Sequence, residues 1–131
     1  MESKVERQER KAKMRSLMKG VTGMTPEKRA ALAAAVPGIV NTVGHVLSIK
    51  NTVLLSMQAG GRGLTIVGGY KQWLAVGRQV RQGEHGMAIW FPGQVRTHDA
   101  NGADLIDAEV RFMVGTVFDI SQTDEITGVT A

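Results

Sequence analysis

The order of apolar and polar residues divides the chain into a helical first half and an extended second half. Residues 2–19 contain strong helix formers and neither glycine nor proline, which predicts a helix that ends near Gly20. Apolar side chains are sparse over most of this segment, so we expect the helix to be largely exposed. Thr25 and Pro26 are typical of a helix start and predict a short second helix.

Two more helices are expected in the middle of the chain. Ser48 is a suitable N-cap for a helix over 49–57, whose apolar residues recur at helical spacing. Asn51 is a poor helix former inside this apolar segment, which indicates a specific hydrogen bond. Its amide either contacts a ligand or satisfies a neighbouring loop. Glycines at each end predict a short helix over 70–76.

The extended half consists of apolar runs separated by turn residues, which is typical of β-strands. The expected strands cover residues 64–67, 87–91, 94–97 and 108–119. Pro92-Gly93 is expected to end the second of these strands, and Asn101-Gly102 is a strong signal for a hairpin turn. Gly115, within the longest run, indicates a bulge or a close backbone approach.

These elements predict the α+β class: a small single domain with N-terminal helices and a small, mainly antiparallel sheet. A chain of 131 residues can bury one hydrophobic core. We expect a basic N-terminal helix or arm over 1–24 and an α+β domain over 25–131.

Composition narrows the class of protein further. The absence of cysteine excludes disulfides and thiolate metal sites. Apolar runs are too short to span a membrane, and the charged N-terminus lacks the apolar core of a secretory signal. These features favour a cytoplasmic location.

Charge is distributed unevenly along the chain. The formal net charge is +4, yet residues 85–131 contain seven acids and two arginines. Residues 50–84 contain five lysines and arginines and one glutamate. We therefore expect a positive face for an anionic partner, the alternative being charges that only keep a small domain in solution.

The segment from Gly69 to Gly86 combines aromatic and basic side chains. Tyr70 and Trp73 alternate with Lys71, Arg78 and Arg81. Rings that stack on bases and cations that follow phosphates are what a protein needs to hold a flexible nucleic-acid strand. The alternative is that the rings face the core.

Residues for catalysis are missing. The three histidines do not form a His-Glu-x-x-His motif, and no serine lies in a Gly-x-Ser-x-Gly elbow. The acids Asp99, Asp104, Asp107 and Glu109 cluster beside turn residues, where solvated loop charges are expected. We predict neither an enzyme nor a metal or cofactor site.

Three sequence blocks resemble the N-terminal domain of the ArdC antirestriction family. The first is Ser48-Ile49-Lys50-Asn51 with Leu54-Leu55 and Gln58, and the second runs from Gly69-Tyr70-Lys71-Gln72-Trp73 to Gly86. The third is Val117-Phe118-Asp119-Ile120-Ser121-Gln122-Thr123. The chain departs from the pattern at Leu47, where relatives have an aromatic residue, at His85, where they have lysine, and in the loop 60–63.

The resemblance implies a small domain that binds single-stranded DNA in proteins of plasmids and phages. In fuller family members a zinc-metallopeptidase domain follows, and we do not expect that activity in this chain. The expected nucleic-acid-binding residues are Lys50, Asn51, Arg62, Tyr70, Lys71, Trp73, Arg78 and Arg81. Trp90 is a further stacking candidate whose alternative is a place in the core.

A second hypothesis belongs to a different class of function. The same fold could serve as a protein-interaction or inhibitor module that occupies a host restriction or defence protein, with the basic N-terminal segment as a docking element. Nuclease treatment distinguishes the two hypotheses, since partners held through nucleic acid would be lost.

Overall fold

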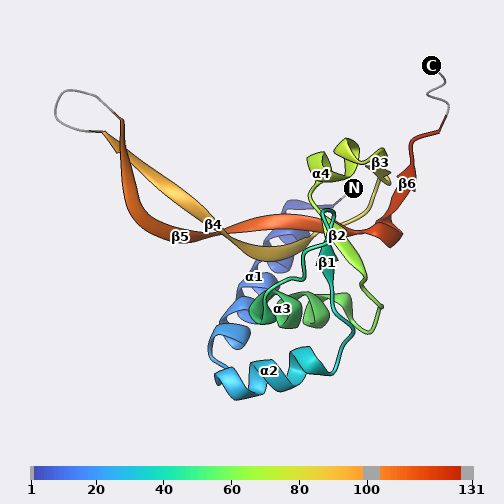
Figure 1. Ribbon diagram of the computed structural model, residues 1–131. Coiled ribbons are helices and arrows are strands. Elements are labelled where there is room, and N and C mark those ends of the chain that lie inside the picture. The colour runs from blue at the N-terminus through green and yellow to red at the C-terminus, as the bar shows by residue number, and fades with distance from the viewer. Residues whose placement is uncertain (1, 99–103, 128–131) are drawn as a thin grey trace.

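Helix α3 packs against one face of a curled β-sheet, and the other elements surround this pair (Figure 1). The computed structural model describes residues 2–98 and 104–127, with side chains described for 2–92 and 113–127. Its elements are α1 (Lys4–Thr22), α2 (Pro26–Ala34), β1 (Val40–Asn41), α3 (Ile49–Ala59), β2 (Ile66–Gly68), α4 (Tyr70–Ala75), β3 (Arg78–Val80), β4 (Met87–His98), β5 (Asp104–Asp119), η1 (Ile120–Gln122) and β6 (Thr123–Glu125). The predicted α+β class is confirmed.

Local capping determines where the first three helices begin. Ser3, Thr25 and Ser48 each accept a hydrogen bond from the backbone N–H three residues later, at 3.1–3.2 Å. The helix starts predicted at Thr25 and Ser48 are therefore confirmed. The expected stop at Gly20 is wrong, because α1 continues to Thr22 and buries Val21 completely. A glycine inside a helix costs only about 1 kcal/mol, which such packing can offset.

The main sheet has the strand order β1-β2-β5-β4. The short strands β1 and β2 are parallel, whereas β2 with β5 and β5 with β4 are antiparallel. A second, two-stranded antiparallel sheet joins β3 to β6. The sheet is thus mainly antiparallel, as expected, and β2 begins two residues later and ends one residue later than the predicted strand 64–67.

Strand β4 continues through Pro92 and Gly93, so the predicted break there is wrong. The reason is that β4 lies at the edge of the sheet, where a proline removes no ladder hydrogen bond if its nitrogen faces outward. The pairing with β5 runs from Met87 opposite Val117 to His98 opposite Asp104, with a register shift between Gln94 and Arg96. The predicted Asn101-Gly102 turn lies outside the described residues.

Gly115 allows a close approach, as its sequence context predicted. A Cβ atom at this position would lie 2.9 Å from the ring of Phe91 on the paired strand. The aromatic ring therefore lies directly over the glycine, and a larger residue there would displace it.

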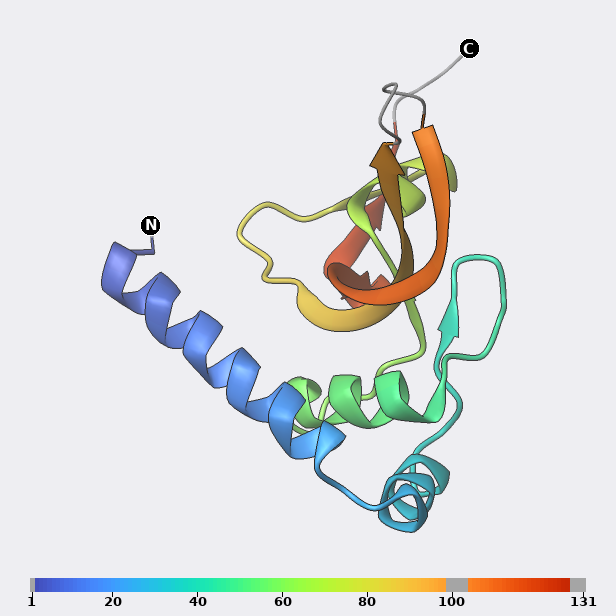
Figure 2. The same ribbon diagram turned by 90° about the vertical axis from the view of Figure 1, so that its left-hand side faces the viewer.

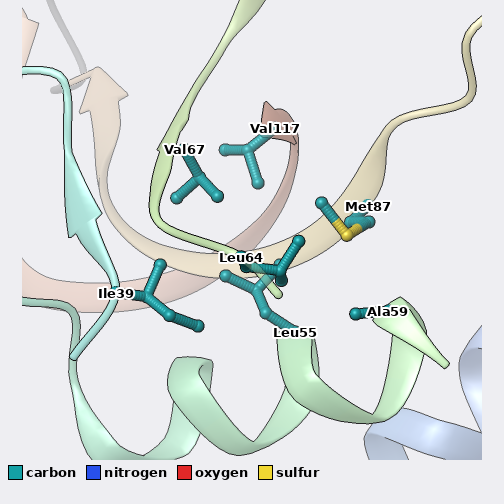
Figure 3. Close-up of a cluster of buried hydrophobic side chains, with 7 residues drawn as sticks. All are labelled: Ile39, Leu55, Ala59, Leu64, Val67, Met87 and Val117. Atoms are coloured by element: carbon teal, nitrogen blue, oxygen red, sulfur yellow. The ribbon is translucent and has the colours of Figure 1, made fainter. Parts of the chain in front are cut away.

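Two clusters of buried side chains hold the helices to the sheet. Figure 3 shows the first, where α3 contributes Leu55 and Ala59, and Val67, Met87 and Val117 come from strands. The second joins α1 to α3 through Val21, Val53 and Leu54, with Trp90 of β4 packed against it.

The helices are divided between the two sides of the sheet. In Figures 1 and 2 the helices α1, α2 and α3 lie on one side, while α4 and the β3–β6 pair lie on the other. The β4–β5 hairpin extends well beyond the helices (Figure 1). The chain therefore passes from one side of the sheet to the other between α3 and α4, by way of β2.

Candidate nucleic-acid interface

Asn51 and Gln58 of α3 bind the backbone of β4. Asn51 Nδ2 donates to the Trp90 carbonyl oxygen, and the Trp90 N–H donates to Asn51 Oδ1, both at 2.8 Å. Gln58 makes the same two bonds with Ala88, at 2.8 and 2.7 Å. We call these two residues the amide clamp. Each amide has the donor and acceptor that one peptide unit needs, so it completes an edge that no strand among the described residues covers.

The amide clamp supplies the specific hydrogen bond that the sequence indicates for Asn51. Both of its polar side-chain atoms form hydrogen bonds with the protein backbone, so the amide has a structural role. The partner is a strand rather than the expected loop, and it lies 39 residues away in sequence. Asn51 therefore supports the site by holding the backbone of Trp90 in place.

Arg78 and Arg81 bind the C-terminal segment of the fold. Arg78 Nε donates to Thr123 Oγ1 at 2.7 Å and its Nη2 donates to the Thr123 carbonyl oxygen at 3.1 Å. Arg81 donates to the carbonyl oxygens of Ser121 and Thr123 and forms an ion pair with Asp124 at 3.0 Å. Both guanidinium groups, expected to hold phosphates, are thus engaged in anchoring η1 and β6.

The two aromatic residues of α4 differ in exposure. Trp73 is only 2% exposed, and its indole N–H donates to the Phe118 carbonyl oxygen at 2.9 Å. The ring lies inside the fold, which is the core placement weighed as the alternative to stacking, and its polar atom is satisfied. Tyr70 is 49% exposed and Lys71 is exposed beside it. These two remain available on the side of the sheet opposite α3.

A pocket lies where the N-terminal end of α3 meets β4. Its volume is about 450 Å³, and its walls include Val46, Leu47, Lys50, Asn51, Trp90 and Pro92. Lys50 Nζ lies 4.7 Å from the centre of the Trp90 ring, within the range of a cation–π contact. We call this cavity the Trp90 pocket. It offers an aromatic face, an aliphatic wall and one ammonium group together.

Sequence reasoning identified only part of this pocket. Lys50 and Trp90 were both candidates, but they lie 40 positions apart and nothing in the sequence joins them. Val46, Leu47 and Pro92 were missed as lining residues. Leu47 falls where relatives of the family have an aromatic residue, and this was the one available signal.

A second cavity separates α1 from the C-terminal end of α3. It has a volume of about 210 Å³ and is lined by Arg10 and Lys13 of α1, by Arg62 and by His85, with methionine and leucine side chains between them. We call it the α1 groove. Of the expected binding residues only Arg62 lies here, and Lys50 lies at the other end of α3.

Glu2 binds Arg10, one of the residues that line the α1 groove. Its carboxylate accepts two hydrogen bonds from the Arg10 guanidinium, both at 2.8 Å. The hydrogen bond with Arg10 lowers the pKa of Glu2, and the positive potential of Arg10, His85 and Arg7 acts in the same direction. The same bond raises the pKa of Arg10. Both groups are therefore charged at neutral pH.

Two classes of feature do not occur in the described part of the chain. Within residues 2–92 and 113–127, whose side chains the structure describes, no three histidine, cysteine or acidic side chains are grouped so that they could hold a metal ion. Over the same residues, no helix combines the length and the apolar character that crossing a membrane requires.

The fold and the sequence together define a small α+β domain of the antirestriction class. The family model described as the N-terminal domain of anti-restriction factor ArdC matches residues 6–118. The chain belongs to this family, and the resemblance found in the three sequence blocks is confirmed. The match begins inside α1, earlier than those blocks indicated.

Solved structures show the same fold. The metal-free crystal structure of the antirestriction protein ArdC from plasmid R388 superposes with a TM-score of 0.60 at 21% identity, over 88% of this chain. Its Mn(II)-bound structure gives 0.56 at 21% identity, over 77% of this chain. The chain spans about two fifths of the length of that protein, with 42% and 39% covered. None of the curated proteins matches the chain.

Proposed function

We propose that this domain is a non-catalytic, single-stranded DNA-binding module that acts in the cytoplasm in an antirestriction role. The observation that carries the proposal is the Trp90 pocket, where Lys50 lies 4.7 Å from the ring centre of Trp90. An unpaired base can enter a cavity of about 450 Å³ and stack on an indole, and the ammonium group can meet the adjoining phosphate. Family membership supplies the antirestriction context.

The geometry favours a single strand over a duplex. Bases in a duplex are stacked on one another, so their faces are closed to an aromatic side chain unless the helix is opened at a cost of a few kcal/mol. Stacking contributes about 1–3 kcal/mol per base, which a single strand gains without that cost. Tyr70 and Lys71 stay predicted contacts for a strand that passes the other side of the sheet.

Fluorescence anisotropy with labelled oligo-dT tests the proposal. We expect binding at low salt that weakens steeply as salt rises, and weaker binding of a duplex of equal length. Lys50→Gln should lower the affinity and reduce the salt dependence by about one phosphate contact. Lys28→Gln removes the same charge from the exposed face of α2 and should leave the affinity near wild type.

Tryptophan fluorescence tests the place of binding. The chain has two tryptophans, so Trp73→Phe leaves Trp90 as the only one. Stacking of a base should quench its emission with the same midpoint as the anisotropy change. Binding without quenching would move the site away from the pocket, and no binding of oligo-dT at low salt would refute the proposed function.

A protein-interaction role is the second candidate, and one observation favours it. The β4–β5 hairpin carries exposed apolar side chains at Phe91, Met113 and Val114, the last of which is 59% exposed. Exposed apolar surface of this kind marks interaction sites in many proteins. Capture of a host defence protein that survives nuclease treatment and is lost on Val114→Asp would support this role.

A further inference from the structure

The α1 groove gathers positive charge that the proposed stacking pocket does not use. Arg10 and Lys13 come from α1, Arg62 follows α3, and His85 lies on the turn before β4. These four residues belong to three separate segments, so the fold and not the local sequence brings them together. Lysine and arginine side chains converging on a small cavity are a recognised form of anion site.

The parts of the groove opposite α1 are fixed in place. The His85 carbonyl oxygen accepts a hydrogen bond from Gln122 Nε2 at 2.8 Å, which ties its turn to the buried Gln122 side chain of η1. Arg62 Nε donates to the Ala59 carbonyl oxygen at 3.3 Å. Among the described residues, the terminal nitrogens of Arg62 have no hydrogen-bond partner, so they can donate to an incoming anion.

The contact with Glu2 shows that an anion can bind the Arg10 guanidinium group. The Glu2 carboxylate is bound through two parallel hydrogen bonds of 2.8 Å. Phosphate presents the same pair of acceptor oxygens to a guanidinium group and carries at least as much negative charge. The Glu2 carboxylate therefore occupies the position that a phosphate group would take at Arg10.

We propose that the α1 groove is a phosphate-binding site and that Glu2 is its internal competitor. A phosphate group displaces the Glu2 carboxylate from Arg10 and is then held by Arg10, Lys13 and Arg62. The phosphate can come from a nucleic-acid backbone or from a free polyphosphate. This inference does not depend on the Trp90 pocket, which lies at the other end of α3.

Calorimetric titration of the full chain with inorganic tripolyphosphate at low salt tests the inference. Glu2→Gln should tighten binding about two- to fivefold, the effect of removing one exposed ion-pair competitor. Arg62→Gln should weaken it by about tenfold, since a charge-assisted contact is lost. Lys28→Gln, on α2, is the matched control.

The outcomes separate this inference from the proposed function. Trp90→Leu should leave tripolyphosphate binding unchanged while it weakens oligo-dT binding, so either proposal can fail alone. Binding of an abasic deoxyribose-phosphate oligomer should then be measured with the same variants. If its affinity depends on Glu2 and Arg62 in the same way, the phosphate comes from a nucleic-acid backbone. If only tripolyphosphate binds, the ligand is free phosphate. The inference is overturned if Glu2→Gln binds tripolyphosphate no more tightly than wild type does. It is also overturned if Arg62→Gln binds it with the same affinity as Lys28→Gln. Thermal unfolding confirms that each variant folds.

Discussion

Asn51 connects one peptide unit of β4 to helix α3 through both atoms of its amide. The bond is specific because an amide is the side-chain counterpart of a peptide group, with one donor direction and one acceptor. Leucine of similar size would fill the same space and leave the Trp90 N–H and carbonyl oxygen without partners. Asn51 thus contributes to stability more through its hydrogen bonds to the Trp90 backbone than through the space that its side chain fills.

Asn51→Ala should lower the free energy of unfolding by about 1–3 kcal/mol, because it leaves partly buried backbone groups unsatisfied. Urea denaturation followed by circular dichroism measures the change. Gln8→Ala, on the exposed face of α1, is the control and should be near neutral. A loss at Asn51 no larger than the loss at Gln8 would show that water replaces the amide at no cost.

Local signals explain what could be predicted at the residue scale. The caps at Thr25 and Ser48 involve a side chain and a backbone group three residues apart, so the sequence contains both partners. The bonds of Asn51 and Trp73 reach 39 and 45 residues along the chain. Sequence patterns indicated that Asn51 needed a partner, but the partner itself depends on the fold.

Short elements in this fold depend on side chains from other segments. Strand β6 has three residues and pairs only with β3, which is equally short. A two-stranded sheet of this size is marginal by itself. Arg78 and Arg81 add hydrogen bonds to its backbone and to Asp124, and so they compensate for the missing length.

The double variant Arg78→Ala with Arg81→Ala should therefore unfold at a lower temperature than wild type. We expect a loss of about 1 kcal/mol or more, with faster hydrogen exchange in β3 and β6, because hydrogen bonds from charged donors are removed. Lys28→Ala removes an exposed charge from α2 and serves as the control. An unchanged melting temperature together with reduced oligo-dT affinity would instead restore the phosphate-binding role predicted from sequence.

Strand β4 shows how far a proline-glycine pair can predict the end of a strand. Pro92-Gly93 between apolar runs predicts an end to a strand, and this is correct for a central strand. The strand here continues because its neighbour on one side is β5 and on the other side is a helix. Which strand forms the edge of a sheet depends on the topology, and for this reason the local sequence could not predict the continuation.

At the scale of the whole molecule, α1 is attached to the domain at its C-terminal end. Val21 is 0% exposed and packs with Val53 and Leu54 of α3, while Val5 on the same helix is 62% exposed. The division of the chain between residues 24 and 25 stays a prediction. The packing of Val21 nevertheless gives α1 a measurable share in the stability of the core.

Val21→Ala should destabilise the protein by about 2 kcal/mol, the loss of two buried carbon atoms with some cavity cost. Val5→Ala makes the same chemical change at the exposed end of α1 and should have little effect. Denaturant unfolding of both variants measures the difference. Equal, small losses would show that α1 behaves as an independent arm.

The charge pattern along the chain predicted one positive face, and the fold distributes those charges differently. Lys50 and Arg62 lie at the two ends of α3, whereas Tyr70 and Lys71 lie on the opposite side of the sheet. Arg78 and Arg81 are engaged with acids and carbonyl groups of the C-terminal segment. Net charge by segment could not show this, because it takes no account of which charges are neutralised by contacts distant in sequence.

The amide clamp also constrains the register of β4 in the long hairpin. The clamp bonds to Ala88 and Trp90, and the residues between and beside them point their backbone groups at β5 instead. A slip of β4 by one residue would present both amides with groups that are already paired. A slip by two residues in one direction would place Pro92, which has no N–H, opposite Asn51. Helix α3 therefore favours the observed register of β4 over these slipped ones, and its two amides help to set how far the hairpin projects.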